Sequence, residues 1–158
     1  MAETVGRLTR IVLEGETLHR LSALQEADRN QAVLDLETEN EFAPVSQPLV
    51  QSILHLSIQD GRLIFDIRDA EDLPIVAVGL AMGPFKMLIK DYQMLLDSYA
   101  GAIAEGREAK IQAIDMGRRG LHNEGATLMQ ERLTGKIETD FPTARRLFTL
   151  VCALHQKL

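Results

Sequence analysis

The fold class of this chain follows from one stretch, residues 54–67, which read LHLSIQDGRLIFDI. Apolar residues recur at every second position on each side of a central Asp60-Gly61 pair: Leu54, Leu56 and Ile58 before it, and Leu63, Phe65 and Ile67 after it. A period of two places apolar side chains on one face of a strand. Asp-Gly supplies the positive φ angles that a tight hairpin turn needs. The stretch therefore predicts a β-hairpin with one apolar face.

The flanking segments predict the other elements. Residues 8–13 (LTRIVL) and 75–80 (IVAVGL) are apolar and β-branched, which favours strands, whereas 42–48 contains two prolines and is expected to be a connection. Residues 26–39 predict a helix. Three more helices are expected: one that starts at Gly83-Pro84 and is broken by Gly106, one from about Glu108 to Leu133 that is capped by Gly135, and a last one capped by Asp140 with Pro142 in its first turn.

The order of these elements predicts the architecture. Strands grouped apart from helices are typical of an α+β fold rather than of a parallel nucleotide-binding sheet. We expect a small, mostly antiparallel sheet, a hairpin and meander of three or four strands, packed against a layer of three to four helices. The apolar stripe from Phe85 to Ile103 is suited to cover the hairpin. Residues 1–158 are expected to form a single domain, with mostly strands and one helix in 8–81 and three helices in 84–156.

Length, composition and charge narrow the classes of function. A chain of 158 residues with 46% hydrophobic residues can bury a core as one domain, and its net charge of −6 disfavours nucleic acid as a partner. The single cysteine, Cys152, excludes an internal disulfide and a Cys-rich zinc site, and its apolar neighbours predict a core residue. No apolar run approaches the roughly 18 residues of a membrane span. Residues 1–4 lack a signal-peptide pattern, so we expect a cytoplasmic protein without a membrane partner.

Charge is unevenly distributed along the chain. Residues 1–105 contain 8 Lys/Arg and 17 Asp/Glu, whereas residues 106–158 contain 9 and 6. An acidic and a basic half attract one another, either within one subunit or between two. Together with glycine-rich helix faces, this asymmetry leads us to expect a homodimer or a larger symmetric oligomer.

The candidate chemistry lies mainly in residues 115–125, DMGRRGLHNEG. On a continuous helix Asp115, Arg118 or Arg119, and His122 are three or four residues apart and share a face. A carboxylate, a guanidinium and an imidazole side by side can bind an anion and move a proton at neutral pH. The candidate catalytic residues are therefore Asp115 and His122, and the candidate ligand-binding residues of this stretch are Arg118, Arg119, Asn123 and Glu124.

The same stretch has a structural interpretation. Its glycines, at 117, 120 and 125, each destabilise a helix by about 1 kcal/mol relative to alanine. They indicate either a break in the helix or the close approach of another part of the chain. Surface ion pairs and tight helix packing would then account for the whole cluster.

A second basic pair, Arg145-Arg146, lies one turn into the last helix. Two guanidinium groups near free backbone N–H groups can hold a phosphate or a carboxylate. The alternative is that Asp140 or Glu138 pairs with one of the arginines. No nucleotide-binding loop, nucleophile motif or metal-ligand spacing accompanies either basic cluster, so the sequence names no metal and no cofactor.

Three interpretations of function stay open. The first, slightly favoured, is a binding or regulatory module that holds a small anionic ligand or an acidic protein partner with the arginines at 118, 119, 145 and 146. The second is a small enzyme acting on a phosphate- or carboxylate-bearing substrate, with Asp115 orienting His122. The third treats the cluster as a dimer interface without a ligand.

Residues 113–125, AIDMGRRGLHNEG, strongly resemble the signature of a bacterial family of uncharacterised proteins, the UPF-class family numbered two-six-two, which is typical of alphaproteobacteria. A second similar block covers 135–138, 140–141 and 143–152 and ends at His155. Weaker similarity reaches back to residues 26–42. The family's first helix usually opens with Glu-His-Glu-Arg, where this chain has Glu26-Ala27-Asp28-Arg29, and one charge of a basic pair is lost at Lys86-Met87. The resemblance implies a small cytoplasmic bacterial protein and brings no established activity, cofactor or catalytic residue.

Overall fold

The computed structural model describes residues 6–15 and 21–155. Within these ranges the chain forms an α+β fold, which confirms the predicted class. The helices are α1 (Ala23–Thr38), α2 (Lys86–Glu105), α3 (Glu108–Leu133) and α4 (Phe141–Leu154), and a 3-10 turn at Gly83–Phe85 leads into α2. The strands are β1 (Arg7–Glu14), β2 (Phe42–Pro44), β3 (Gln51–Gln59), β4 (Arg62–Arg68), β5 (Pro74–Ala81) and β6 (Ile137–Thr139).

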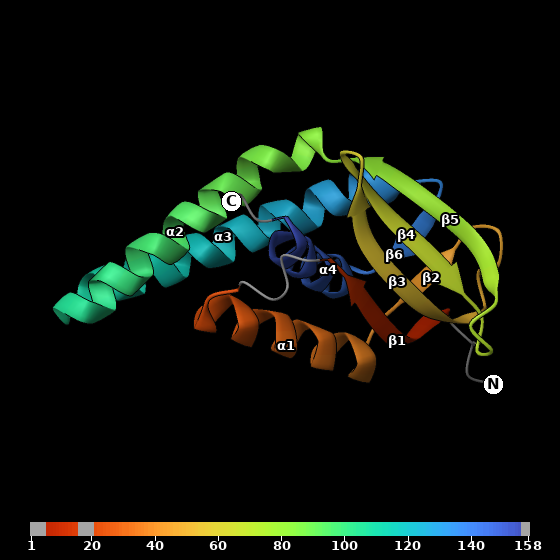
Figure 1. Cartoon of the computed structure of the whole chain (residues 1–158), viewed down its shortest axis with the longest axis horizontal. Helices are drawn as coiled ribbons and strands as arrows, with labels where there is room; N and C mark the ends of the chain where they lie inside the picture. The colour runs from red at the N-terminus through yellow and green to blue at the C-terminus, as the bar shows by residue number, and fades with distance from the viewer. Residues whose placement is uncertain (1–5, 16–20, 156–158) are drawn as a thin grey trace.

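The predicted hairpin is formed by β3 and β4, which lie at the centre of a four-stranded sheet ordered β1-β3-β4-β5 (Figure 1). Its turn has positive φ angles at Asp60 (51°) and Gly61 (73°), as the Asp-Gly pair predicts. β5 continues the meander antiparallel to β4, whereas β1 pairs with β3 in parallel. The sheet is therefore mostly antiparallel, as expected. Its parallel edge arises because the chain crosses through α1 between β1 and β3.

Two local expectations need correction. The segment 42–48, expected to be a connection, contains β2, which pairs with β6 in a separate two-stranded sheet. Three-residue strands are too short to show a period, and their pairing partner is distant in the chain. The first helix begins at Ala23 rather than Glu26. Ser22 caps this helix by accepting a hydrogen bond from the backbone N–H of Gln25, and the side-chain oxygen of Gln25 accepts one from the backbone N–H of Ser22. This Ser-x-x-Gln capping box is the sequence signal for the earlier start.

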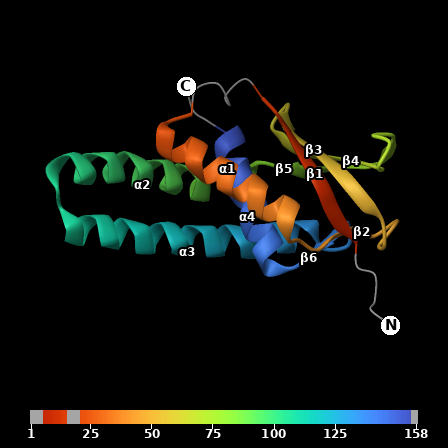
Figure 2. The same ribbon diagram turned by 90° about the horizontal axis from the view of Figure 1, so that it is seen from below.

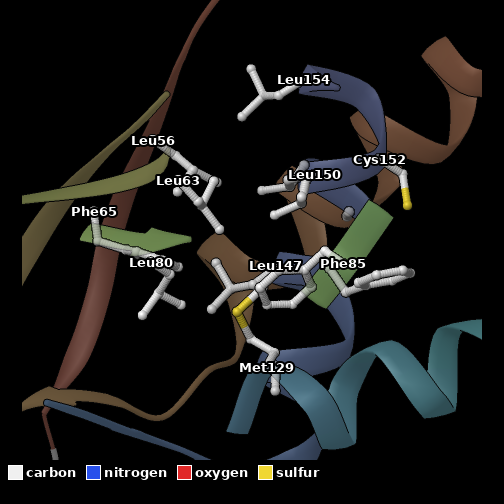
Figure 3. Packing of buried hydrophobic residues seen from close by; sticks show 14 of the residues in the cluster. Leu56, Leu63, Phe65, Leu80, Phe85, Met129, Leu147, Leu150, Cys152 and Leu154 are labelled. Atoms are coloured by element: carbon white, nitrogen blue, oxygen red, sulfur yellow. The ribbon is translucent and has the colours of Figure 1, made fainter. Parts of the chain in front are cut away.

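The main core lies between the sheet and α4. In Figure 3 side chains of the sheet face side chains of α4, and all of them are buried: Leu56, Leu63 and Phe65 on one side, and Leu147, Leu150 and Leu154 on the other. Every residue of α4 from Leu147 to Leu154 is buried. Cys152 belongs to this set, which confirms it as a core residue, and burial raises the pKa of its thiol.

α2 does not cover the hairpin along the length of its apolar stripe. It starts next to the sheet and then runs away from it beside α3 (Figures 1 and 2). Ile103, near its end, is 53% exposed. α4 takes the place expected for α2 because its second half, Leu147–Leu154, is buried on every side and almost entirely apolar. It can therefore fill the space between the sheet and the other helices.

The predicted caps and breaks of the last three helices are confirmed. The side chain of Asp140 accepts a hydrogen bond from the backbone N–H of Thr143, with a proline in the first turn of α4. Gly106 and Gly135 adopt left-handed conformations where α2 and α3 end. The residues from Asp115 to Gly125 are helical throughout, so α3 is not broken at its glycines.

The glycine at position 125 is accounted for by the close approach of α4. A Cβ atom added there would lie 2.3 Å from Cγ of Phe148, so α3 and α4 pack through the missing side chain. Gly120, one and a half turns earlier on α3, has no other atom within 4 Å of that position. The expectation of close backbone approach therefore holds at Gly125 and not at Gly120.

A candidate anion site between three helices

Three helices that are far apart in the chain meet around one cavity of about 270 Å³. α4 packs against both α1 and α3 (Figures 1 and 2). Six of the lining residues come from α3 and α4: Arg118, Arg119, His122, Arg145, Arg146 and Thr149. α1 contributes two carboxylates, Asp28 and Asp35. Helical spacing groups them, because residues three, four or seven apart lie on one face of a helix.

Two of the four arginines are held by carboxylates. Arg118 lies 3.3 Å from Asp28 and 3.6 Å from Asp115. Arg146 lies 4.0 Å from Asp35, and its guanidinium also donates a hydrogen bond to the backbone carbonyl of Glu39 at 3.1 Å. These contacts join the acidic front half of the chain to its basic back half, as its charge distribution allows. They also fix the two guanidinium groups at the cavity.

The other two arginines have no carboxylate partner in the described part of the chain. Arg145 donates a hydrogen bond from Nε to the side-chain oxygen of Asn123 at 3.1 Å, and this partner is neutral. Arg119 is exposed, and no ion pair joins it to any described residue. Burial, together with the charges of Arg119, Arg146 and Arg118, lowers the pKa of Arg145. The cavity therefore concentrates positive charge that the protein itself balances only in part.

His122 is a deeply buried polar residue of the cavity, with 7% of its surface exposed, as is Thr149. Its Nδ1 lies 3.0 Å from the hydroxyl oxygen of Thr149, and that hydroxyl donates a hydrogen bond to the backbone carbonyl of Arg145 at 3.2 Å. A hydroxyl has one proton to donate, so Nδ1 of His122 must carry the proton of the first bond. The other ring nitrogen, Nε2, is buried and has no hydrogen-bond partner among the described residues.

The charge state of His122 follows from its surroundings. Burial, and the positive charges of Arg145 and Arg118, lower its pKa to about 4. The ring is therefore neutral at neutral pH. The rings of Tyr92 and Phe148 lie against it, with centroids 5.2 and 6.1 Å away. With the proton on Nδ1, the neutral ring offers a lone pair at Nε2.

Asp28 connects the site to a third part of the helical layer. Its Oδ2 accepts hydrogen bonds from the hydroxyl of Tyr92 on α2, at 2.5 Å, and from Arg118 on α3, at 3.3 Å. Burial and the Asp28 carboxylate raise the pKa of Tyr92, so the phenol keeps its proton and remains a donor. One carboxylate thus holds α1 against α2 and α3 beside the cavity.

The structure brings together part of the predicted site. Arg118, Arg119, His122, Arg145 and Arg146 line the cavity, and Asp115 and Asn123 contact its arginines. Glu124 is exposed and is not among the lining residues. In the described residues no hydrogen bond joins Asp115 to His122; Asp115 contacts Arg118, and His122 contacts Thr149. Neither Asp140 nor Glu138 pairs with Arg145 or Arg146 there.

Five residues of the cavity were not predicted from the sequence: Asp28, Gln31, Ala32, Asp35 and Thr149. The two carboxylates are seven residues apart, or two turns of α1, which is a usable signal for a shared helix face. Thr149 carried no such signal, because it lies in a run of apolar residues that predicts only core packing.

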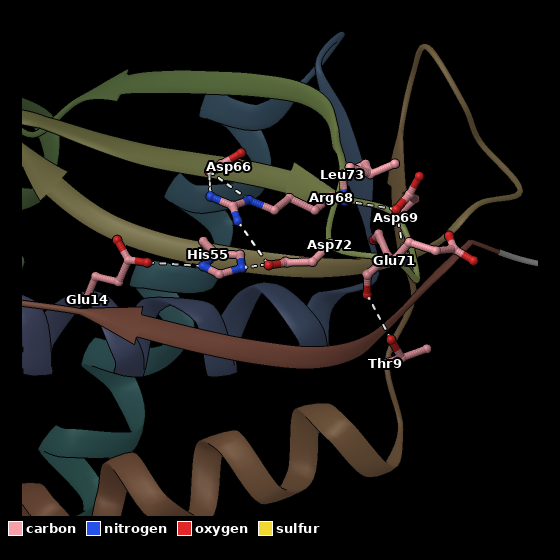
Figure 4. Close-up of polar contacts among 10 residues, drawn as sticks. Thr9, Glu14, His55, Asp66, Arg68, Asp69, Glu71, Asp72 and Leu73 are labelled. Atoms are coloured by element: carbon pink, nitrogen blue, oxygen red, sulfur yellow. Dashed lines mark hydrogen bonds and ion pairs between the residues drawn. The ribbon is translucent and has the colours of Figure 1, made fainter.

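A second polar cluster lies on the sheet (Figure 4). His55 of β3 contacts Glu14 of β1 at 3.1 Å through Nδ1 and Asp72 at 2.9 Å through Nε2. Arg68 of β4 contacts Asp66 at 2.9 Å and Asp72 at 3.1 Å. These ion pairs connect β1, β3 and β4 with the turn that follows β4. Partly exposed pairs of this kind contribute little each to stability, and we assign the cluster a structural role.

The fold and the cavity together define a class: a small α+β protein with an arginine-lined cavity between three of its helices. The chain belongs to the uncharacterised protein family UPF0262, whose family model matches residues 5–157. This confirms the resemblance stated from the sequence.

Relatives of the chain carry the same family name. The chain is 62% identical to the UPF0262 protein of Acidiphilium cryptum, covering 99% of this chain and 96% of that protein. It is 61% identical to the UPF0262 protein of Granulibacter bethesdensis, over 96% and 91% of the two chains. Identity to the UPF0262 protein of Paramagnetospirillum magneticum is 48%, over 94% and 95%. No solved structure matches this chain. In the part of the chain that the structure describes, no helix is both long and apolar enough to cross a membrane.

Proposed function

We propose that this protein is a cytoplasmic binding module for a small, multiply charged anion held between α1, α3 and α4. One observation carries the proposal: four guanidinium groups line a single cavity, and two of them, those of Arg119 and Arg145, face no carboxylate in the described residues. Guanidinium groups bind phosphate and carboxylate groups through paired, charge-assisted hydrogen bonds. An anion would balance the positive charge that Asp28, Asp35 and Asp115 leave uncompensated.

The size of the cavity favours a small ligand over an acidic protein. Pockets for drug-sized molecules have volumes of about 300–1,000 Å³. The cavity at about 270 Å³ lies below this range. A phosphate group or a short carboxylic acid fits such a space.

The contacts of the two candidate catalytic residues support binding rather than catalysis. A general base needs a pKa near the working pH, and the pKa of His122 is about 4. Asp115 contacts Arg118 and does not hold the imidazole. We therefore place the enzyme interpretation second.

The test is a set of single arginine substitutions measured by isothermal titration calorimetry with inorganic phosphate and with sulfate at low ionic strength. Arg119→Gln and Arg145→Gln are each expected to raise Kd by about tenfold, because a hydrogen bond between charged groups contributes about 1.5–3 kcal/mol. Arg132→Gln is the matched control: Arg132 is exposed on the same helix as Arg119 but does not line the cavity, and its removal should leave Kd within about twofold.

The outcome that would overturn the proposal is equally direct. If neither phosphate nor sulfate binds to the wild-type protein, or if Arg132→Gln weakens binding as much as Arg119→Gln does, the cavity is not an anion site.

A further inference from the structure

We propose that the cavity selects a phosphate dianion that brings its own hydrogen-bond donor, and that Nε2 of His122 accepts that hydrogen bond. This inference rests on the proposed anion site and adds its ligand specificity. The donor is either the hydroxyl of hydrogenphosphate itself or a hydroxyl carried by a phosphate ester.

The charge of the ligand follows from the pairing of the arginines. Asp28 and Asp35 stand against Arg118 and Arg146, at 3.3 and 4.0 Å. Arg119 and Arg145 are left without a carboxylate in the described residues, and both line the cavity. Asp115 also faces Arg118, so the four arginines and three carboxylates leave one net positive charge. The two guanidinium groups without a carboxylate supply paired donors for a phosphate with two ionised oxygens.

The donor follows from the buried acceptor. Arginine side chains have only hydrogen-bond donors. They bind the ionised oxygens of an anion and cannot accept a hydrogen bond from a hydroxyl group of the ligand. Other acceptors line the cavity as well: the carboxylates of Asp28 and Asp35, which already face Arg118 and Arg146, and the side chain of Gln31. Nε2 of His122 differs from the carboxylates in being a neutral acceptor, because the other ring nitrogen donates to Thr149 and the ring is neutral. Nε2 itself is buried without a partner among the described residues. A buried polar atom left unsatisfied is costly, and a donor on the ligand would satisfy it.

Sulfate lacks what this arrangement requires. It has the charge and shape of hydrogenphosphate but no proton near neutral pH, so it would place an oxygen lone pair against the lone pair of Nε2. Sites built to hydrogen-bond a ligand's hydroxyl reject analogues that lack it, because their own buried group then stays unpaired. The two dianions should therefore differ in affinity although the arginines treat them alike.

The experiment compares four probes on the wild-type protein by calorimetry at about pH 8, where phosphate esters are dianions: inorganic phosphate, sulfate, methyl phosphate and glycerol 3-phosphate. Either inorganic phosphate or glycerol 3-phosphate is expected to bind at least about tenfold more tightly than both sulfate and methyl phosphate, which have no donor. Tight binding of inorganic phosphate together with weak binding of methyl phosphate would identify the phosphate's own hydroxyl as the donor. Tight glycerol 3-phosphate alone identifies the hydroxyl of an ester. Equal affinity for all four probes would overturn the inference.

His122→Asn then tests the residue. The asparagine amide retains an N–H group for Thr149 but removes the acceptor at Nε2. The preference of at least about tenfold should disappear, while sulfate affinity stays within about twofold. Arg119→Gln should weaken all four probes by a similar factor. A preference that survives in His122→Asn contradicts the specificity and leaves the anion site standing, whereas unchanged binding of every probe in Arg119→Gln contradicts the site itself. If circular dichroism shows that His122→Asn does not fold, the comparison of the four probes on the wild-type protein still tests whether the site prefers a ligand with a hydroxyl donor.

Discussion

Gly125→Ala is expected to destabilise the protein by about 2–3 kcal/mol, although alanine is normally the better helix former by about 1 kcal/mol. The added methyl group would lie 2.3 Å from Cγ of Phe148, and that ring is fully buried in α4. Cγ is close to the backbone, so the ring cannot move aside without shifting α4 against α3. Overpacking of this kind outweighs the gain in helix propensity.

The matched control is Gly120→Ala on the same helix. Nothing lies within 4 Å of its added Cβ, so the ordinary preference for alanine should appear as a stabilisation of about 0.5–1 kcal/mol. Urea denaturation of the two variants and the wild type measures both effects. For a chain of this length the loss in Gly125→Ala corresponds to a Tm lower by roughly 4–12 °C. If both substitutions stabilise the protein, the packing of α3 against α4 is not as described.

Stability should also fall between about pH 6.5 and pH 4 because of His122. The folded protein holds this imidazole neutral down to a pKa of about 4, whereas in the unfolded chain it takes up a proton near its ordinary value of about 6.5. Over that interval the unfolded state binds more protons, so acidification favours unfolding. Protonation of His122 is expected to lower the free energy of unfolding by about 3 kcal/mol in total. The full loss is reached below about pH 4, and there is none above about pH 7.

The measurement is the free energy of unfolding in urea at several pH values, in buffers without phosphate or citrate, for the wild type and His122→Asn. The variant is expected to be less stable than the wild type at neutral pH, because the smaller amide leaves space beside Tyr92 and Phe148. Its stability should depend on pH less steeply than that of the wild type between pH 6.5 and 4. Parallel curves for the two proteins would show that His122 is not the group responsible.

The helices and the main sheet could be predicted from the sequence because their signals are local. The alternation around Asp60-Gly61, the glycines at 106 and 135 and the cap at Asp140 each act within a few residues of themselves. β2 and β6 could not be found in this way, since Phe42 pairs with Thr139 and neither strand is long enough to have a pattern. The choice of α4 over α2 as the cover of the sheet depends on how whole helices pack, which the apolar stripe of α2 does not reveal.

The candidate site was predictable in its basic half. Helical spacing placed Arg118 and His122 on one face, and the Arg145-Arg146 pair stood out by charge. That these two groups share a cavity depends on the packing of α3 against α4 through Gly125, which sequence spacing alone does not specify. The acidic lining was hidden among the other carboxylates of α1, and the role of Thr149 became visible only through its bonds to His122 and Arg145.

The most direct test of the anion site is a crystal structure of the protein with tungstate, a phosphate-shaped dianion that is located by its anomalous scattering. A tungstate peak is expected in the cavity between α1, α3 and α4, within hydrogen-bond distance of the guanidinium groups of Arg119 and Arg145. A cavity without tungstate, with these two arginines paired to carboxylates of the same or a neighbouring chain, would rule out the anion site and identify the cluster as a packing interface.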